Sequence, residues 1–148
     1  CAYGWTGPWA ARRGFDSLVQ MSCGISDFGM KNADASKPVP LPVQALDHAT
    51  GYLMAASAVK ALLIRQQSGI VRSARHSLAR TAHLLCDTAQ KTRNHIMPPE
   101  TPGDIDPRVE VTNWGAARRI RFPAVIDGVP ARWNHPAGRL RSSPAVWS

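Results

Sequence analysis

The sequence of 148 residues predicts an α/β protein with a long central helix, short strands and long proline-rich loops. Residues 45–64 are almost all apolar or small, as in a buried helix. Three short segments have the composition of strands: residues 70–79, 108–115 and 118–126. Two proline-rich stretches, 26–43 and 95–107, are expected to separate these elements as irregular connectors.

The first predicted helix lies near the start of the chain, within residues 14–25. It follows residues 1–13, which are rich in Gly, Pro and Trp, as loops are. Its apolar residues recur at roughly helical spacing: Phe15, Leu18, Val19 and Met21. Asp16 or Ser17 is expected to cap this helix, and Gly24 is expected to end it.

The remaining elements follow the second helix in order. We expect that helix to begin near Gln44 and to end at the polar RQQSG, with Gly69 as its C-cap. Residues 70–79 show a patchy alternation that favours a strand, and residues 80–94 form a short amphipathic helix. After the second proline-rich break come the two further predicted strands and a loop-like tail, 127–148.

The net charge of +8 and the pI near 10.3 are the strongest signals in the composition. Such a surplus suits an anionic partner, which is a nucleic acid, a membrane surface or a small molecule that carries phosphate. The longest apolar run is interrupted by Lys60 and flanked by Asp47 and Arg65, so it is too short and too polar to span a membrane. A hydrophobic content of 44% is sufficient for a packed core.

The cysteines argue against a disulfide scaffold. Cys1, Cys23 and Cys86 are far apart and odd in number, and the sequence has no Cys-x-x-Cys motif. Reduced thiols in a cytoplasm match this pattern best. His83 and Cys86 have the spacing of two metal ligands on a helix, but no second pair accompanies them, so we predict no metal site.

Asp47 is the acid at the head of the long apolar segment. In the first turn of a helix, the unpaired backbone N–H groups and the helix dipole favour a negative charge. The residues on its face are small or flexible and leave room beside the acid: Gly51, Met54, Ala55 and Ala58. An ionised carboxylate in such a niche is suited to act as a nucleophile or a general base. An acid that only stabilises its own helix has the same pattern, so spacing leaves both interpretations open.

Three motifs in order resemble the class III CoA-transferases, the family of carnitine CoA-transferase, formyl-CoA transferase and the 2-methylacyl-CoA racemases. The first is GPWAARRGFDSLVQ, and the second is the helix start Asp-x-x-Thr-Gly, which runs here from Asp47 to Gly51. The third is the Ala-rich helix that ends in a basic turn with a glycine. The resemblance is strong over residues 3–90 and weaker over 104–148.

The resemblance implies a role for each of five residues. Asp47 occupies the position of the family's nucleophile, which attacks an acyl-CoA thioester and passes through a mixed anhydride and an aspartyl-CoA thioester. Arg13 matches a basic residue that lies near coenzyme A. Phe15 and Asp16 match an aromatic–acid pair that lines the acyl and carboxylate end. His48 follows Asp47 and is placed to reach the substrate, although adjacent helix residues do not face each other.

The resemblance also implies substrates and organisation. It predicts acyl-CoA and a carboxylic acid acceptor as partners, a homodimer when full length, and neither a metal, nor nucleic acid, nor a membrane as partner. Residues 1–95 would carry the catalytic aspartate and 96–148 the β- and loop-rich end of one cytoplasmic transferase, as a fragment that lacks the N-terminal half. An acyl-CoA racemase or isomerase is an alternative, although the racemases place histidine where this chain has Phe15. A non-catalytic basic binding fragment is the second alternative.

Overall fold

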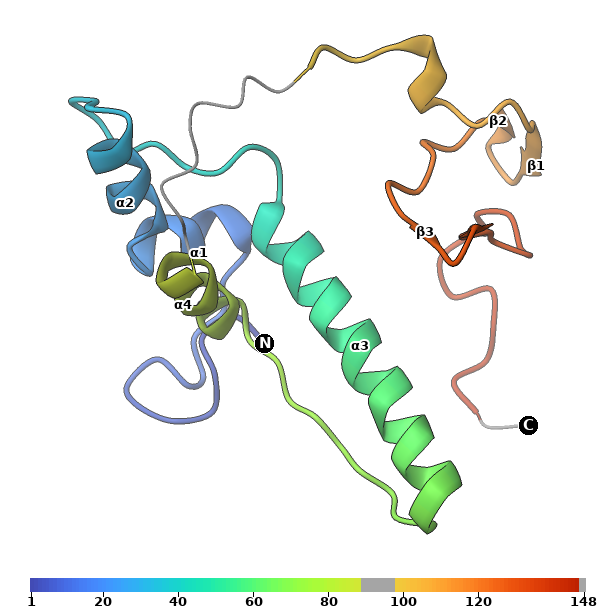
Figure 1. Cartoon of the computed structure of the whole chain (residues 1–148), viewed down its shortest axis with the longest axis horizontal. Coiled ribbons are helices and arrows are strands. Elements are labelled where there is room, and N and C mark those ends of the chain that lie inside the picture. The colour runs from blue at the N-terminus through green and yellow to red at the C-terminus, as the bar shows by residue number, and fades with distance from the viewer. Residues whose placement is uncertain (89–97, 147–148) are drawn as a thin grey trace. The chain divides into compact units, whose positions relative to one another are not determined.

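The structure is a computed structural model that describes residues 1–88 and 98–146. The chain forms two compact units, Cys1–Arg93 and Asn94–Ser148 (Figure 1). The first unit carries the α-helices of the described chain, and the second carries its short strands. This confirms the expected mixture of helices and short strands. The division at residue 95 and the status of the chain as a fragment stay predictions.

Two short helices stand where one was predicted. Helix α1 spans Asp16–Ser22 and helix α2 spans Ile25–Asn32, and the chain turns between them at Gly24, which has a φ of 88°. Glycine is the residue that adopts this left-handed conformation without strain. The prediction of an irregular connector from residue 26 is wrong, because Ile25 is buried and anchors a second helix. An ion pair of 2.6 Å between Lys31 and Asp27, four residues apart, also supports α2.

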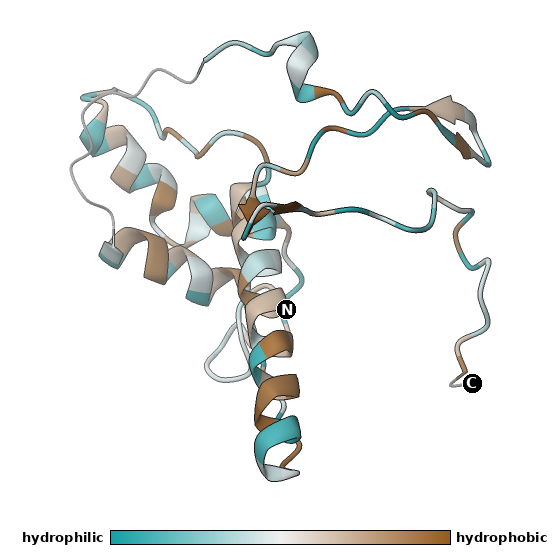
Figure 2. Cartoon of the chain, turned by 45° about the vertical axis from the view of Figure 1, so that its right-hand side comes forward, coloured by the Kyte–Doolittle hydropathy of each residue, from teal (hydrophilic) through white to brown (hydrophobic). Residues whose placement is uncertain are grey.

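Helix α3 spans Ala45–Ser68 and ends at Gly69, which has a φ of 70°. This start and this C-cap agree with the sequence prediction. The expected burial is wrong for most of the helix, because only Leu46 and Thr50 are buried. Hydrophobic and hydrophilic residues both occur along the rest of α3 (Figure 2), and several large apolar residues there are exposed: Tyr52, Met54, Val59, Leu62 and Leu63.

Helix α4 spans Leu78–Thr88, and the rest of the predicted helix, 89–94, lies outside the described residues. The strand predicted over 70–79 is wrong, because residues 70–77 form no regular element and α4 begins at Leu78. The chain there instead meets the first residues of the unit. The Leu78 N–H donates to the Cys1 carbonyl at 3.1 Å, and the Ala79 N–H donates to the Ala2 carbonyl at 2.9 Å. These bonds fix the start of α4.

The core of the first unit lies where α1 and α4 meet the beginning of α3, and α2 packs against α1 and α4. Its buried apolar residues come from all four helices and from the first residues of the chain: Ala2, Val19, Ile25, Leu46 and Ala82. The hydroxyls of Thr50 and Thr81 form a buried hydrogen bond of 2.8 Å between α3 and α4. The first turns of α3 are therefore fixed by packing, whereas the remainder extends beyond this core.

The described part of the second unit contains two short antiparallel hairpins. Strand β1 (Glu110–Thr112) pairs with β2 (Gly115–Ala117), and β3 (Val125–Ile126) pairs with β4 (Val129–Pro130). A single 3-10 turn, η1 (Pro102–Asp104), precedes them. The second hairpin turns at Asp127 and Gly128, both with positive φ, as a two-residue hairpin turn requires.

The two strands predicted in this unit are shorter than expected. The predicted strand 108–115 folds back on itself at Asn113 and Trp114, so it supplies β1 and the start of β2. The predicted strand 118–126 is largely irregular, apart from a bridge from Ile120 to Ile105 and its last two residues in β3. Alternation alone did not indicate these turns.

None of the helices in the described parts of the chain is long and apolar enough to cross a membrane.

Gly29 and Gly51 offer a matched test of the packing on α2. A Cβ at Gly29 would overlap the Val39 carbonyl oxygen, whereas a Cβ at Gly51 would meet nothing within 4 Å. We expect Gly29→Ala to lower the free energy of unfolding by about 1–3 kcal/mol through overpacking. Gly51→Ala should raise it by roughly 0.5–1 kcal/mol, because alanine favours a helix interior. Urea unfolding of both variants checks this, and equal stability of the two variants would contradict the packing described.

Candidate active site at the head of helix α3

Asp47 is the third residue of α3, and it is exposed. The helix begins no earlier because Val43 has a positive φ of 53°, and Leu46, which is fully buried, anchors its first turn. Gln44 is the N-cap residue, and its side chain makes no capping hydrogen bond. The backbone N–H groups of this turn therefore need acceptors from elsewhere. In this chain the carboxylate of Asp47 is open to solvent, and it does not lie in the dry niche that its spacing predicted.

The acceptor for the Asp47 amide comes from another helix. The backbone N–H of Asp47 donates to Oδ2 of Asp16 at 2.8 Å. Asp16 is the first residue of α1, and only 2% of its surface is exposed. The sequence predicted Asp16 as one of two possible caps of α1. Its side chain does not cap that helix, because the N-cap residue is Phe15 and no side-chain cap bond is made. Asp16 instead caps the beginning of α3 from a distance of 31 residues in sequence.

Gln20 holds the second oxygen of Asp16. Its Nε2 donates to Oδ1 of Asp16 at 2.6 Å, and its Oε1 accepts from the backbone N–H of Leu41 at 2.7 Å. Gln20 is also buried. The three bonds link α1, the connector before α3 and the first turn of α3. We refer to Leu41, Gln20, Asp16 and the Asp47 amide as the amide relay.

The charge on Asp16 is balanced by dipoles, since no ion pair to it occurs within residues 1–88 and 98–146. A buried carboxylate is costly unless its oxygens accept hydrogen bonds. Here each oxygen accepts one N–H, and Oδ2 lies at the positive end of the 24-residue helix α3. Sequence reasoning missed Gln20, although its position four residues after Asp16 on one helix face was a usable signal.

The other residues implied by the family resemblance lie on exposed surface. The guanidinium of Arg13 lies 6.0 Å from the centre of the Phe15 ring, and the Phe15 side chain is 63% exposed. Arg13 also borders a cavity of about 280 Å³. The other residues that line it are Tyr3, Arg12, Leu18, Met21 and Ser22. His48 is exposed next to Asp47. The structure thus brings Asp16 to the Asp47 backbone and Arg13 to Phe15.

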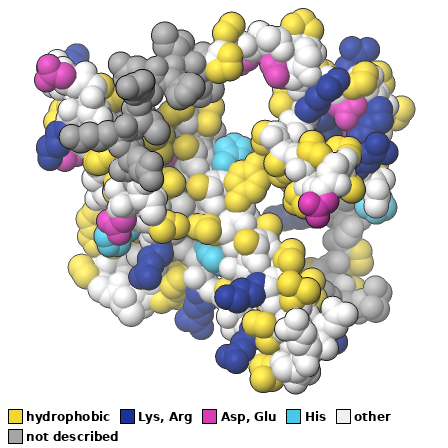
Figure 3. Space-filling view, viewed as in Figure 1, with side chains coloured by type: hydrophobic (Ala, Val, Ile, Leu, Met, Phe, Trp, Pro, Cys, Tyr) yellow, Lys and Arg dark blue, Asp and Glu magenta, His cyan; other side chains and the backbone are white. Residues whose placement is uncertain are grey.

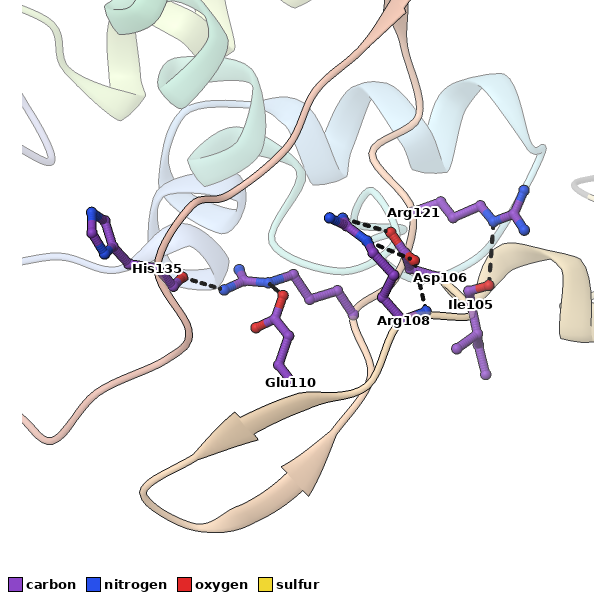
Figure 4. A network of polar contacts seen from close by, with 7 residues as sticks. Ile105, Asp106, Arg108, Glu110, Arg121 and His135 are labelled. Atoms are coloured by element: carbon purple, nitrogen blue, oxygen red, sulfur yellow. Dashed lines mark hydrogen bonds and ion pairs between the residues drawn. The ribbon is translucent and has the colours of Figure 1, made fainter.

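The second unit holds a separate network of arginines (Figure 4). Arg119 donates to Glu110 at 2.6 Å and to the His135 carbonyl at 3.1 Å. Arg108 and Asp106 form an ion pair of 3.0 Å. Figure 3 shows Lys and Arg side chains grouped over this unit with acidic ones among them. A cavity of about 400 Å³ lies here, and its lining includes four arginines and two aromatic rings: Arg108, Arg119, Arg121, Arg132, Phe122 and Trp133.

The described residues contain no cluster of metal-ligand side chains. Residues 1–88 and 98–146 hold no group of three or more His, Cys, Asp or Glu side chains that could share a metal ion. His83 lies 3.3 Å from Asp87, four residues further along α4. Burial raises the pKa of the Cys86 and Cys23 thiols, so both are poorer thiolate donors than an exposed cysteine at neutral pH.

Comparison with known proteins finds a family that matches most of this chain. The family model described as "CoA-transferase family III" matches residues 1–118. A curated protein of Mycobacterium tuberculosis, "Probable fatty acyl-CoA transferase Rv3272", is 36% identical to this chain over 69 residues. That match covers 47% of this chain and 17% of the relative.

Two crystal structures of Rv3272 are also similar to this chain. One is 31% identical with a TM-score of 0.49, and covers 58% of this chain and 24% of its own. The other is 27% identical with a TM-score of 0.48, and covers 70% of this chain and 28% of its own. This chain therefore spans less than a third of the length of the relatives that it matches.

The Asp106 carboxyl provides a pH test of the arginine network. Hydrogen bonds from Arg108 lower the pKa of Asp106 from 3.8 to about 2. A lowered pKa means that the contact favours the folded unit above the ordinary pKa and is lost as the pH falls through about 2. Carboxyl NMR should follow this midpoint, and Arg108→Gln should return it toward the ordinary value. A midpoint that is ordinary before the substitution would contradict the bonds described.

Proposed function

This chain belongs to family III of the CoA-transferases, and we propose that its Asp47 is the nucleophile of an acyl-CoA:carboxylate CoA-transferase. The observation that carries the proposal is the placement of Asp47. Its carboxylate is exposed in the first turn of a 24-residue helix, while its backbone is held by a buried acid. Such a carboxylate is accessible to a substrate, and the backbone that carries it is held in one position. The name of the curated relative supports an acyl-CoA as the donor.

The proposed reaction begins with attack by Asp47. One carboxylate oxygen forms a bond to the thioester carbon of acyl-CoA, the C–S bond breaks, and the CoA thiolate leaves with the electron pair. The product is a mixed anhydride between Asp47 and the acyl group. The thiolate then attacks the aspartyl carbon of this anhydride and releases the donor as a free carboxylate. Asp47 is left as a thioester with CoA.

The second half of the reaction reverses these steps with a new acid. The acceptor carboxylate attacks the aspartyl thioester, which releases the CoA thiolate and forms a second anhydride. The thiolate attacks the acyl carbon of the acceptor, and the new acyl-CoA leaves with Asp47 free again. No net proton is taken up or released. The chain therefore needs a carboxylate nucleophile and a cation for CoA, but no proton carrier in these steps.

We assign the remaining predicted residues to the substrate. Arg13 would bind a phosphate of CoA, because a guanidinium makes paired hydrogen bonds to phosphate oxygens. The exposed Phe15 ring would contact the acyl group, and His48, beside Asp47, would contact the bound acid. Phe15 also favours transfer over racemisation, since a phenyl ring does not carry a proton where the racemases have histidine. Asp16 is the exception: both of its oxygens accept hydrogen bonds within the amide relay, and its predicted contact with the substrate stays a prediction.

We propose that this chain is the aspartate-bearing part of a longer cytoplasmic enzyme that works as a homodimer. The exposed apolar side chains of α3 support this, because a soluble enzyme covers most of such a surface. The small share of each relative that the chain matches also supports it. The acids that serve as donor and acceptor would then be chosen by pockets that include other segments.

Trapping of the covalent intermediate tests the role of Asp47. The protein that contains residues 1–148 is incubated with acyl-CoA and hydroxylamine, and the modified carboxyl is mapped by mass spectrometry. We expect a hydroxamate at Asp47, and Asp47→Asn should lower kcat by about 10³-fold or more. Asp34→Asn replaces another exposed acid and should leave kcat unchanged. A hydroxamate at a different carboxyl in an active enzyme would contradict the mechanism.

A second candidate function is favoured by the arginine-lined cavity of the second unit. Four arginines beside two aromatic rings are suited to an anion, such as the backbone of a nucleic acid. Acceptors within the unit already engage three of them, Arg108, Arg119 and Arg121, which leaves them less free to bind a polyanion. We therefore rank this function below transfer.

Binding of random-sequence DNA at low salt separates the two functions. We expect no complex with a Kd below about 10⁻⁶ M in 50 mM salt, since non-specific DNA binders reach roughly 10⁻⁴–10⁻⁶ M even at physiological salt. Fluorescence anisotropy measures this directly. Tight binding that weakens steeply between 50 and 200 mM salt would favour the basic binding module over the enzyme.

A further inference from the structure

The amide relay joins the proposed nucleophile to a buried acid that is almost completely shielded from solvent. We propose that Asp16 is a positioning residue for CoA transfer, which holds the Asp47 backbone so that its carboxylate meets the thioester in a fixed place. This inference rests on the proposed function of Asp47. It assigns Asp16 a role through another residue, instead of the substrate contact that its family position implied.

The location of the cap is the first argument. Helix α3 has Gln44 as its N-cap residue, with no capping bond from that side chain, although Ser, Thr, Asp or Asn there would satisfy the first turn locally. The acceptor is instead Asp16, on a different helix. A local cap stabilises a helix but does not orient it. A cap from α1 also fixes where the first turn of α3 lies relative to α1, and therefore relative to Phe15 and Arg13 at its start.

The second argument is the completeness of the relay. Asp16 and Gln20 are 2% and 1% exposed, and each of the bonds is between 2.6 and 2.8 Å. Both oxygens of Asp16 and both polar atoms of the Gln20 amide have a partner. A fully satisfied buried network is rigid and defines one geometry. The relay thereby fixes the connector at Leu41 and the helix at Asp47 together.

The third argument concerns the charge of the nucleophile during the reaction. The Asp47 side chain is an anion before attack and becomes an uncharged anhydride and thioester afterwards. An anchor on its carboxylate would be lost at each step. Asp16 holds the backbone N–H, which does not change between these states. The hydrogen bond that holds the Asp47 backbone is therefore the same for the free acid and for both covalent intermediates.

The test replaces the charge without changing the shape of the relay. In Asp16→Asn the relay has one donor too many. Either the introduced N–H₂ faces the Asp47 N–H, or the Gln20 amide rotates to accept from it and its own N–H₂ then faces the Leu41 N–H. A displacement of about 1 Å at a reacting group costs up to roughly 10²-fold in rate. We expect kcat to fall about 10- to 100-fold and KM for acyl-CoA to stay within about threefold.

A second substitution should restore the relay. When Asp16→Asn is combined with Gln20→Glu, the introduced amide donates its N–H₂ to the introduced carboxylate, which also accepts from the Leu41 N–H. The oxygen of the introduced amide accepts from the Asp47 N–H. Every donor again has an acceptor, with the negative charge moved by one position. We expect this double variant to recover most of kcat. Asp34→Asn serves as the surface control.

Hydrogen exchange of the Asp47 amide gives a readout that does not need activity. It should be about tenfold or more faster in Asp16→Asn, because the facing donors leave the relay without one of its hydrogen bonds, and close to normal in the double variant, where every donor again has an acceptor. A raised KM with unchanged kcat, or no recovery in a folded double variant, would overturn the positioning role. If Asp47→Asn is active while exchange follows the expected pattern, the proposed nucleophile is wrong and the anchor itself stands.

Discussion

The hydrogen bond from the Asp47 amide to the buried carboxylate of Asp16 is the constraint on which the candidate site depends. It joins the beginning of the longest helix to the shortest one in the first unit. Because Asp16 is also held by Gln20, the orientation of the head of α3 follows from the packing of α1. The buried charge is tolerated because two N–H donors and the positive end of α3 surround it. The site is thus built on backbone geometry, and the exposed side chain of Asp47 extends from it.

The helix that carries Asp47 has two parts with different surroundings. Its first turns contact α1 and α4 through Leu46 and through the hydroxyl bond between Thr50 and Thr81. Beyond these turns, large apolar side chains are exposed, and Gly51 has open space beside it. A large exposed apolar surface is typical of an interaction site. The head of the helix is therefore fixed by packing within this chain, whereas the described residues of the first unit leave the apolar side chains of the remainder exposed.

Prediction from the sequence worked best where a single residue fixes the backbone. Gly69 ends α3, and at Gly24 the chain turns between α1 and α2. Both glycines have a positive φ, which glycine adopts without strain. Prediction from the sequence was wrong where composition was the only signal. Residues 70–77 have the apolar alternation of a strand but no partner for a ladder, and the segment after Gly24 is polar but helical because Ile25 is buried. A turn at Asn113 and Trp114 divides a stretch that alternation treats as one strand.

The sequence by itself determined the family, the start of α3 near Gln44 and the presence of Asp47 in its first turn. These depend on local motifs and on the prolines and glycines that bound the helix. The tertiary structure decided that Asp16 is buried and acts on the Asp47 amide through a bond that spans 31 residues. It also decided that Gln20 completes the relay. The reason is physical: an acceptor for a helix N–H can come from any element that packs against it, and spacing along the chain does not specify which.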